Sequence, residues 1–115
     1  IGSLAFTRRS KLKKVQLPEG LDRIGRDAFS DCDALEELTI PASVKTIDPY
    51  AFASCEGLKK VTFLGVPEHI ARTAFSDCDN LMSIIVPQGE EKKFRKQLHV
   101  TGESDTLVLG EEQKN

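Results

Sequence analysis

Three cysteines are the residues of this 115-residue chain with the clearest capacity for chemistry. They are Cys32, Cys55 and Cys78, each 23 residues from the next. Zinc sites use Cys or His pairs two to five residues apart, so this spacing matches none of them. On neighbouring turns of a coil, about 4.8 Å apart, the thiols would come within disulfide range. We predict instead a column of small buried thiols, reduced and free of metal.

Two pairs of acids flank the first and third cysteines: Asp31 with Asp33, and Asp77 with Asp79. Calcium is bound by clusters of such oxygen ligands, so a calcium site is one interpretation. The two pairs would lie about 10 Å apart in a stacked coil. The sequence also has no glycine-rich calcium loop. We therefore favour solvated acidic corners that form turns.

Residues 8–14 carry five positive charges, which alone would indicate a nucleic-acid or membrane-surface site. The sign of the charge alternates, however, from one 23-residue unit to the next: Lys13-Lys14, Glu36-Glu37 and Lys59-Lys60. Opposite charges on neighbouring parallel strands are mildly favourable, by about 0.2–1 kcal/mol each. The formal net charge is −2, so we predict support for register and solubility and no nucleic-acid partner.

The sequence contains few of the residues and motifs that are typical of catalytic sites. Trp is absent, and the two histidines, His69 and His99, lie in unrelated segments. The sequence contains no nucleophile elbow, phosphate loop or dinucleotide fingerprint. No apolar run approaches the roughly 18–20 residues that cross a bilayer. We predict a protein that is not an enzyme and has no catalytic residues, no metal, no cofactor and no membrane insertion.

A 23-residue repeat positions all of these residues. Several residue types recur at this interval and form columns, meaning equivalent positions in successive units. We predict that the following columns make the structural core: Leu12, Leu35, Leu58 and Leu81; Phe6, Phe29, Phe52 and Phe75; Cys32, Cys55 and Cys78. One unit cannot bury its apolar face alone, but stacked units share a continuous core.

Within one unit, the alternation Leu38-x-Ile40 is typical of a short strand with one buried face. Pro41 has no N–H to donate and should end the strand. The three-residue spacing of Val44 and Ile47 fits either a 3₁₀ or irregular helical turn, or a short second strand followed by a helical turn. The repeat predicts parallel strands near residues 15–17, 38–40, 61–63 and 84–86.

The signature L-x-x-(V/I/L)-x-(I/L)-P-x-x-(V/L)-x-x-I-x-x-x-A-F-x-x-C resembles the BspA-like leucine-rich repeats. This 23-residue class is found mainly in surface proteins of anaerobic bacteria and of some protist parasites. The resemblance implies an α/β-type repeat solenoid used in adhesion or recognition: a right-handed coil of about four rungs with short parallel strands. Three positions depart from the signature: Leu64 replaces proline, Pro67 replaces an aliphatic residue, and Arg9 replaces cysteine. We expect a distorted corner near residues 64–68.

The repeats are predicted to fill residues 1–87: a partial unit at 1–11, complete units at 12–34, 35–57 and 58–80, and a terminal strand at 81–87. Residues 88–115 are predicted to form a capping helix and a tail, with Phe94 and Leu98 lying over the last rung. A small hairpin joining Val100 to residues 107–109 is one interpretation of the tail. Because Ile1 occupies the position of Ile24, the array begins in mid-unit, and we expect a longer natural protein.

The remaining functional candidate is a surface. The outward strand positions form the face on which leucine-rich repeats commonly bind: Lys14, Gln16, Glu37, Thr39, Lys60, Thr62, Ser83 and Ile85. The predicted function is a protein- or glycan-binding module, an adhesin, of a cell-surface or secreted bacterial protein. The alternative is an intracellular, cytoplasmic scaffold or regulatory segment attached to an effector domain, which three free thiols would suit.

Overall fold

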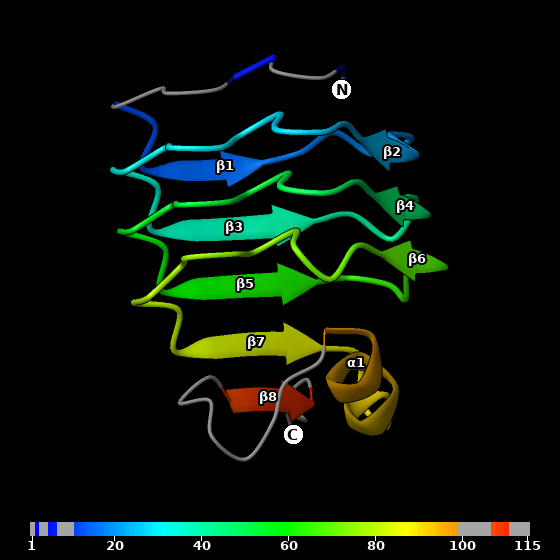
Figure 1. Cartoon of the computed structure of the whole chain (residues 1–115). Coiled ribbons are helices and arrows are strands. Elements are labelled where there is room, and N and C mark those ends of the chain that lie inside the picture. Colours follow the sequence, from blue (N-terminus) through cyan, green and yellow to red (C-terminus); the bar gives the residue numbers. More distant parts are fainter. Residues whose placement is uncertain (1, 3–4, 7–10, 99–106, 111–115) are drawn as a thin grey trace.

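The computed structural model describes residues 2, 5–6 and 11–98, together with the backbone of residues 107–110. Its main feature is a five-stranded parallel sheet, flanked by a three-stranded parallel sheet of very short strands (Figure 1). In spatial order, the main sheet consists of β1 (Lys14–Gln16), β3 (Glu37–Ile40), β5 (Lys60–Phe63), β7 (Ser83–Val86) and β8 (Leu107–Gly110). The second sheet consists of β2 (Arg23–Ile24), β4 (Thr46–Ile47) and β6 (His69–Ile70).

The strands pair in the register that the repeat predicts. Val15 lies opposite Leu38, and Leu38 lies opposite Val61, so residues 23 apart are neighbours in the ladder. This confirms the four predicted parallel strands and the solenoid. The second sheet also resolves the open alternative for the segment after Pro41, because Thr46–Ile47 is a strand rather than a helical turn. Three turns of the coil are complete, each with one main and one short strand.

The corner of the third turn differs from the first two, as expected. In the second turn, the Val44 N–H donates to the Pro41 carbonyl at 3.2 Å and closes a tight turn. The equivalent residue of the third turn, Pro67, has no N–H and cannot make this bond. Gly65 lies directly under Ala42, and a Cβ on Gly65 would come within 2.8 Å of the Ala42 Cα. A glycine is therefore needed where this altered corner crosses its neighbour.

The phenylalanines that follow the short strands form a continuous stack. Ring centroids are 5.0 Å apart for Phe6 and Phe29, and 5.2 Å apart both for Phe29 and Phe52 and for Phe52 and Phe75. The middle rings, Phe29 and Phe52, are 1% and 0% exposed. The expectation of a buried Phe6 needs correction, because Phe6 is 38% exposed. Only its one neighbouring ring, Phe29, covers it among the described residues.

A short helix, α1 (Glu91–Leu98), follows β7 and packs against the last turn (Figure 1). Phe94 is 1% exposed, and its ring centroid lies 4.8 Å from that of Phe63, as the predicted cap requires. The side-chain amide of Gln97 donates to the Pro67 carbonyl at 3.2 Å and ties the helix to the altered corner. The side chain of Leu98 lies outside the described residues.

The hairpin interpretation of the tail did not include a pairing with the main sheet. Residues 107–110 form β8, which pairs in parallel with β7 and extends the main sheet. The expected partner segment around Val100 lies outside the described residues.

Candidate binding surface

The outer face of the main sheet brings the eight predicted binding residues together. Two parallel ladders align them: Lys14, Glu37, Lys60 and Ser83 in one, and Gln16, Thr39, Thr62 and Ile85 in the other. Side chains alternate along each strand, so the intervening residues point inward, and Leu38 and Val61 are 2% and 0% exposed. A rigid framework thus presents both ladders to solvent.

The first ladder is more exposed and more charged than the second. Lys14, Glu37 and Lys60 are exposed, whereas Thr39 and Thr62 are half-buried. The Lys14 Nζ lies 3.9 Å from a Glu37 carboxylate oxygen, and both side chains are largely exposed. Such a pair contributes little to stability, so these charges remain available to a ligand.

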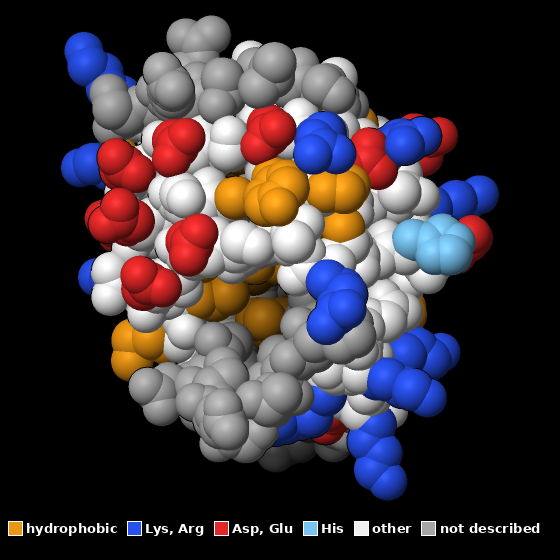
Figure 2. Space-filling view, in the orientation of Figure 1, with side chains coloured by type: hydrophobic (Ala, Val, Ile, Leu, Met, Phe, Trp, Pro, Cys, Tyr) orange, Lys and Arg blue, Asp and Glu red, His pale blue; other side chains and the backbone are white. Residues whose placement is uncertain are grey.

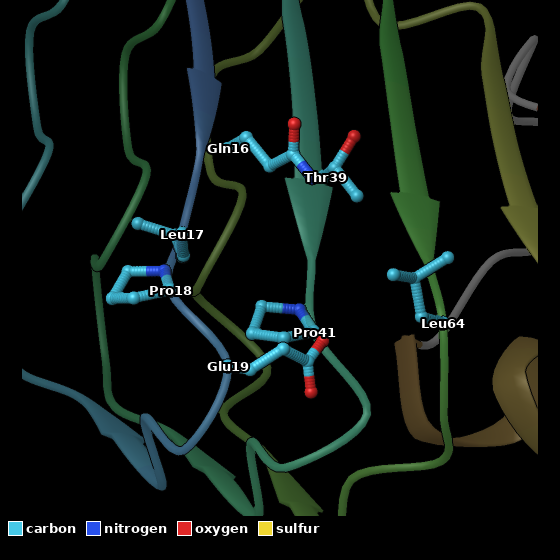
Figure 3. A pocket seen from close by; sticks show the side chains of 7 residues that line it. All are labelled: Gln16, Leu17, Pro18, Glu19, Thr39, Pro41 and Leu64. Atoms are coloured by element: carbon cyan, nitrogen blue, oxygen red, sulfur yellow. The ribbon is translucent and has the colours of Figure 1, made fainter.

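A hollow of about 290 Å³ lies at the carboxyl ends of the first three main strands. Figure 3 shows Gln16 and Thr39 side by side at one end of it, and Leu64 reaching in from the neighbouring strand. The remaining lining residues are Leu17, Pro18, Glu19 and Pro41. Sequence reasoning did not identify this hollow. The sequence feature that could have indicated this hollow is Leu64, which replaces the proline found at this position in the first two turns. Its side chain is 49% exposed.

A second hollow lies at the opposite, amino ends of the strands. It encloses about 470 Å³ between the paired charges of β3 and β5 and the start of β7. Its lining residues are Glu36, Glu37, Lys59, Lys60, Met82 and Ser83. Met82 is 65% exposed, so this hollow also carries an apolar side chain open to solvent.

The cysteines are positioned as part of the framework. Each thiol donates to the carbonyl of the phenylalanine one turn before it: Cys32 to Phe6 at 3.1 Å, Cys55 to Phe29 at 3.1 Å and Cys78 to Phe52 at 3.0 Å. All three are free thiols in this structure. A hydrogen bond with Cys78, together with burial, raises the pKa of the Cys55 thiol. This arrangement binds consecutive turns together.

The acidic corners do not assemble into a cation site. Asp31, Asp33, Asp77 and Asp79 are exposed. Figure 2 shows acidic side chains gathered on the side where the main strands begin. Within the described part of the chain, no group of three or more His, Cys, Asp or Glu side chains could hold a metal ion.

The other candidate charges are scattered. Arg8 and Arg9 of the basic segment lie outside the described residues, as does His99, while His69 is exposed on β6. A close ion pair that sequence reasoning missed joins Arg23 of β2 to Asp48, through nitrogen–oxygen distances of 2.9 and 3.1 Å. None of the helices described here is long and apolar enough to span a bilayer.

Comparison with known proteins identifies the repeat family. A comparison with curated proteins returns no significant match. Among solved structures, a leucine-rich cell surface protein of Faecalibacterium prausnitzii shares 19% identity over 88% of this chain and 32% of its own, with a TM-score of 0.46. The pneumococcal vaccine antigen PcpA shares 20% identity over 96% of this chain and 38% of its own, also with a TM-score of 0.46. The present chain thus spans about a third of the length of either protein.

The sequence profile of the BspA type leucine-rich repeat region matches residues 1–98, in six copies. The match covers most of the chain and includes every complete turn described above. It agrees with the stacking of residues 23 apart, such as Leu38 beside Val61 and Phe29 on Phe52. The chain therefore belongs to the BspA-type leucine-rich repeat family.

Proposed function

We propose that the chain is a non-catalytic recognition module of a cell-surface or secreted protein, and that it binds a protein or glycan ligand on the outer face of its main sheet. The surface location is what membership of the BspA-type family implies. An adhesin that contacts host molecules is the role that suits such a module best.

The exposed Leu64 beside the hollow carries this proposal. In the first two turns this position holds proline, whereas Leu64 places a large apolar side chain, 49% exposed, next to polar Gln16 and Thr39. Binding pockets commonly combine apolar side chains with a few polar groups that fix the orientation of the ligand. The half-exposed Leu64 side chain in this hollow is available for a ligand contact.

The outer face of the main sheet is too small to form a standard protein–protein interface by itself. A standard interface uses about 20–30 residues on each side, and the two ladders supply eight. The ligand would therefore also contact the loops beside the two hollows, or further repeats of a longer protein.

The test is a binding screen against host matrix proteins and glycans with a fourfold variant: Glu37→Ala, Thr39→Ala, Lys60→Ala and Thr62→Ala. We expect the variant to lose capture of any ligand that the unmodified chain binds, with an almost unchanged melting temperature. A matched control replaces the exposed acids Asp33 and Asp79 with Ala and should retain binding. Full binding by the strand-face variant would exclude this face as the site.

The location is tested separately, on intact bacterial cells probed with an antibody against the chain. Labelling of intact cells, or chain in the medium, agrees with a surface or secreted module. Labelling only after lysis would favour the intracellular scaffold, for which the three free thiols are the supporting observation.

A further inference from the structure

Among the described residues, Glu19 is the only charged one that lines the hollow at the carboxyl ends of the first three main strands. The hollow encloses about 290 Å³, and its other lining residues are apolar or polar without a charge. The Glu19 side chain forms no hydrogen bond or ion pair with any described residue. A carboxylate at one end of an otherwise uncharged hollow attracts a cationic group.

Glu19 also has no opposite charge beside it in its own column. The equivalent positions of the following units hold uncharged residues: Ala42, Gly65 and Gln88. On the outer face, by contrast, Lys14 lies opposite Glu37, and Glu37 lies opposite Lys60. Those charges balance one another between strands, whereas the charge of Glu19 is balanced by no residue of its column. Its carboxylate is therefore available to a ligand.

The backbone around Glu19 is held in a tight turn. The Leu21 N–H donates to the Pro18 carbonyl at 3.3 Å, and Gly20 between them has a φ of 95°, which favours glycine. The Ser43 hydroxyl of the next turn accepts from the Gly20 N–H at 3.0 Å and donates to the Leu21 carbonyl at 2.6 Å. These bonds fix the position from which the carboxylate is presented, so a ligand that binds there needs to order little of the backbone.

The shape of the hollow suits one long side chain. Figure 3 shows Glu19 beside Pro41, with Gln16 and Thr39 toward the other end. Leu64 adds an apolar wall that is 49% exposed. Pockets for whole small molecules enclose about 300–1,000 Å³, so a hollow of this size fits a single side chain better. Lysine and arginine combine a cation with a methylene stem that packs along apolar surface.

We infer that the hollow receives an arginine side chain of a protein ligand, and that Glu19 selects it. The inference rests on the proposed function and narrows the partner to a protein with an exposed basic residue, because neutral and acidic glycans offer no cation to Glu19. The methylene stem packs on Pro41 and Leu64, and the guanidinium pairs with the Glu19 carboxylate. Arginine suits the site better than lysine, since its planar guanidinium can form two parallel hydrogen bonds with a carboxylate and is more weakly hydrated. Gln16 and Thr39 then hydrogen-bond the backbone of the ligand.

The experiment is a nuclear magnetic resonance titration of the whole chain with two capped peptides. One is Gly-Ser-Arg-Ser-Gly, and the other carries citrulline, a neutral side chain of nearly the same shape, in place of the arginine. We expect the arginine peptide to shift the amide signals of Gln16, Gly20 and Leu64 and to bind about tenfold more tightly than the citrulline peptide. Absence of binding, equal binding of the two peptides, or shifts confined to other parts of the chain would overturn the inference. So would binding of chitosan oligosaccharides, whose ammonium groups sit on sugar rings, in place of the arginine peptide.

Two variants separate the charge from the apolar wall. Glu19→Gln keeps the size of the side chain and removes its charge, so the arginine and citrulline peptides should bind equally weakly. Leu64→Ala should weaken the binding of both peptides alike and preserve the ratio of their affinities. Glu56→Gln, at an exposed carboxylate outside the hollow, is the matched control and should change neither affinity. All three positions are exposed, so the melting temperatures should barely change, and a preference for arginine that survives Glu19→Gln contradicts the inference.

The screen against host matrix proteins and glycans distinguishes failure of this inference from failure of the proposed function. A ligand that the strand-face variant no longer captures, but that Glu19→Gln captures normally, would uphold the sheet face and overturn the arginine contact. A ligand that the strand-face variant captures fully, but that Glu19→Gln does not, would support the hollow and exclude the two ladders as the site. We expect both variants to lose the same protein ligand.

Discussion

The middle turn of the coil and its end turns contain the same residue types in different environments. Phe52 and Cys55 are both completely buried, whereas Phe75 and Cys78, at equivalent positions one turn later, are partly exposed. Each middle side chain is covered by a neighbour on both sides, and each end side chain lacks one such neighbour among the described residues. In a repeat protein, the contribution of a side chain to the free energy of unfolding therefore depends on the turn in which it lies as well as on its residue type.

The comparison predicts its largest effect at Phe52. Phe52→Ala removes the ring that stacks on both Phe29 and Phe75 and leaves a cavity in the middle of the core. The free energy of unfolding should fall by about 3–5 kcal/mol, which is comparable with the whole stability of a small domain. Chemical denaturation followed by circular dichroism measures the change. Phe6→Ala is the matched end variant and should cost clearly less; equal costs would contradict the comparison.

A smaller effect is expected for the cysteine column. Cys55→Ala leaves the buried Phe29 carbonyl without its thiol donor, at a cost of about 1–3 kcal/mol. Cys78→Ala should cost less, because Cys78 is only half-buried and water can replace the lost donor. Thermal melts of both variants test the order. A larger loss for Cys78→Ala would show that the end turn is the better packed one.

The rates at which the thiols of the unmodified chain react should also differ between the middle and the end turn. A hydrogen bond with Cys55 lowers the pKa of Cys78, whereas the pKa of Cys55 is raised. Since the thiolate is the reactive form, Cys78 should be alkylated first near pH 8, and Cys55 only on unfolding. Mass spectrometry of the native protein treated with iodoacetamide gives the rates. Fast labelling of all three cysteines would disprove the buried column.

The smallest effects should appear on the outer face, where the side chains of both ladders are exposed or half-buried. Gln16→Ala at the end of the sheet and Thr39→Ala nearer its middle should each change stability by less than about 0.5 kcal/mol. Denaturant titration of the two variants provides the measurement. A cost at Thr39 well above the cost at Gln16 would extend the difference between middle and end turns to the surface.

Much of the fold could be predicted because one observation, the 23-residue period, constrains many contacts at once. A strict period places residues such as Leu38 and Val61 side by side, so it determines the parallel register and the inward columns together. The candidate face follows from the same pattern, because side chains of a strand alternate between core and solvent. The Arg23–Asp48 pair was not predictable in this way, since its two residues are 25 apart and occupy different columns.

The sequence by itself determined the period, and with it the parallel strands, the Phe and Cys columns and the outward residues. Only the tertiary structure decided how much each column member is buried, because burial depends on having a turn on each side. It also decided that residues 107–110 join β7 in parallel, because the sequence beyond residue 87 no longer follows the repeat. Likewise, the hollow beside Leu64 arises where neighbouring turns meet, and no single repeat contains the information that sets it.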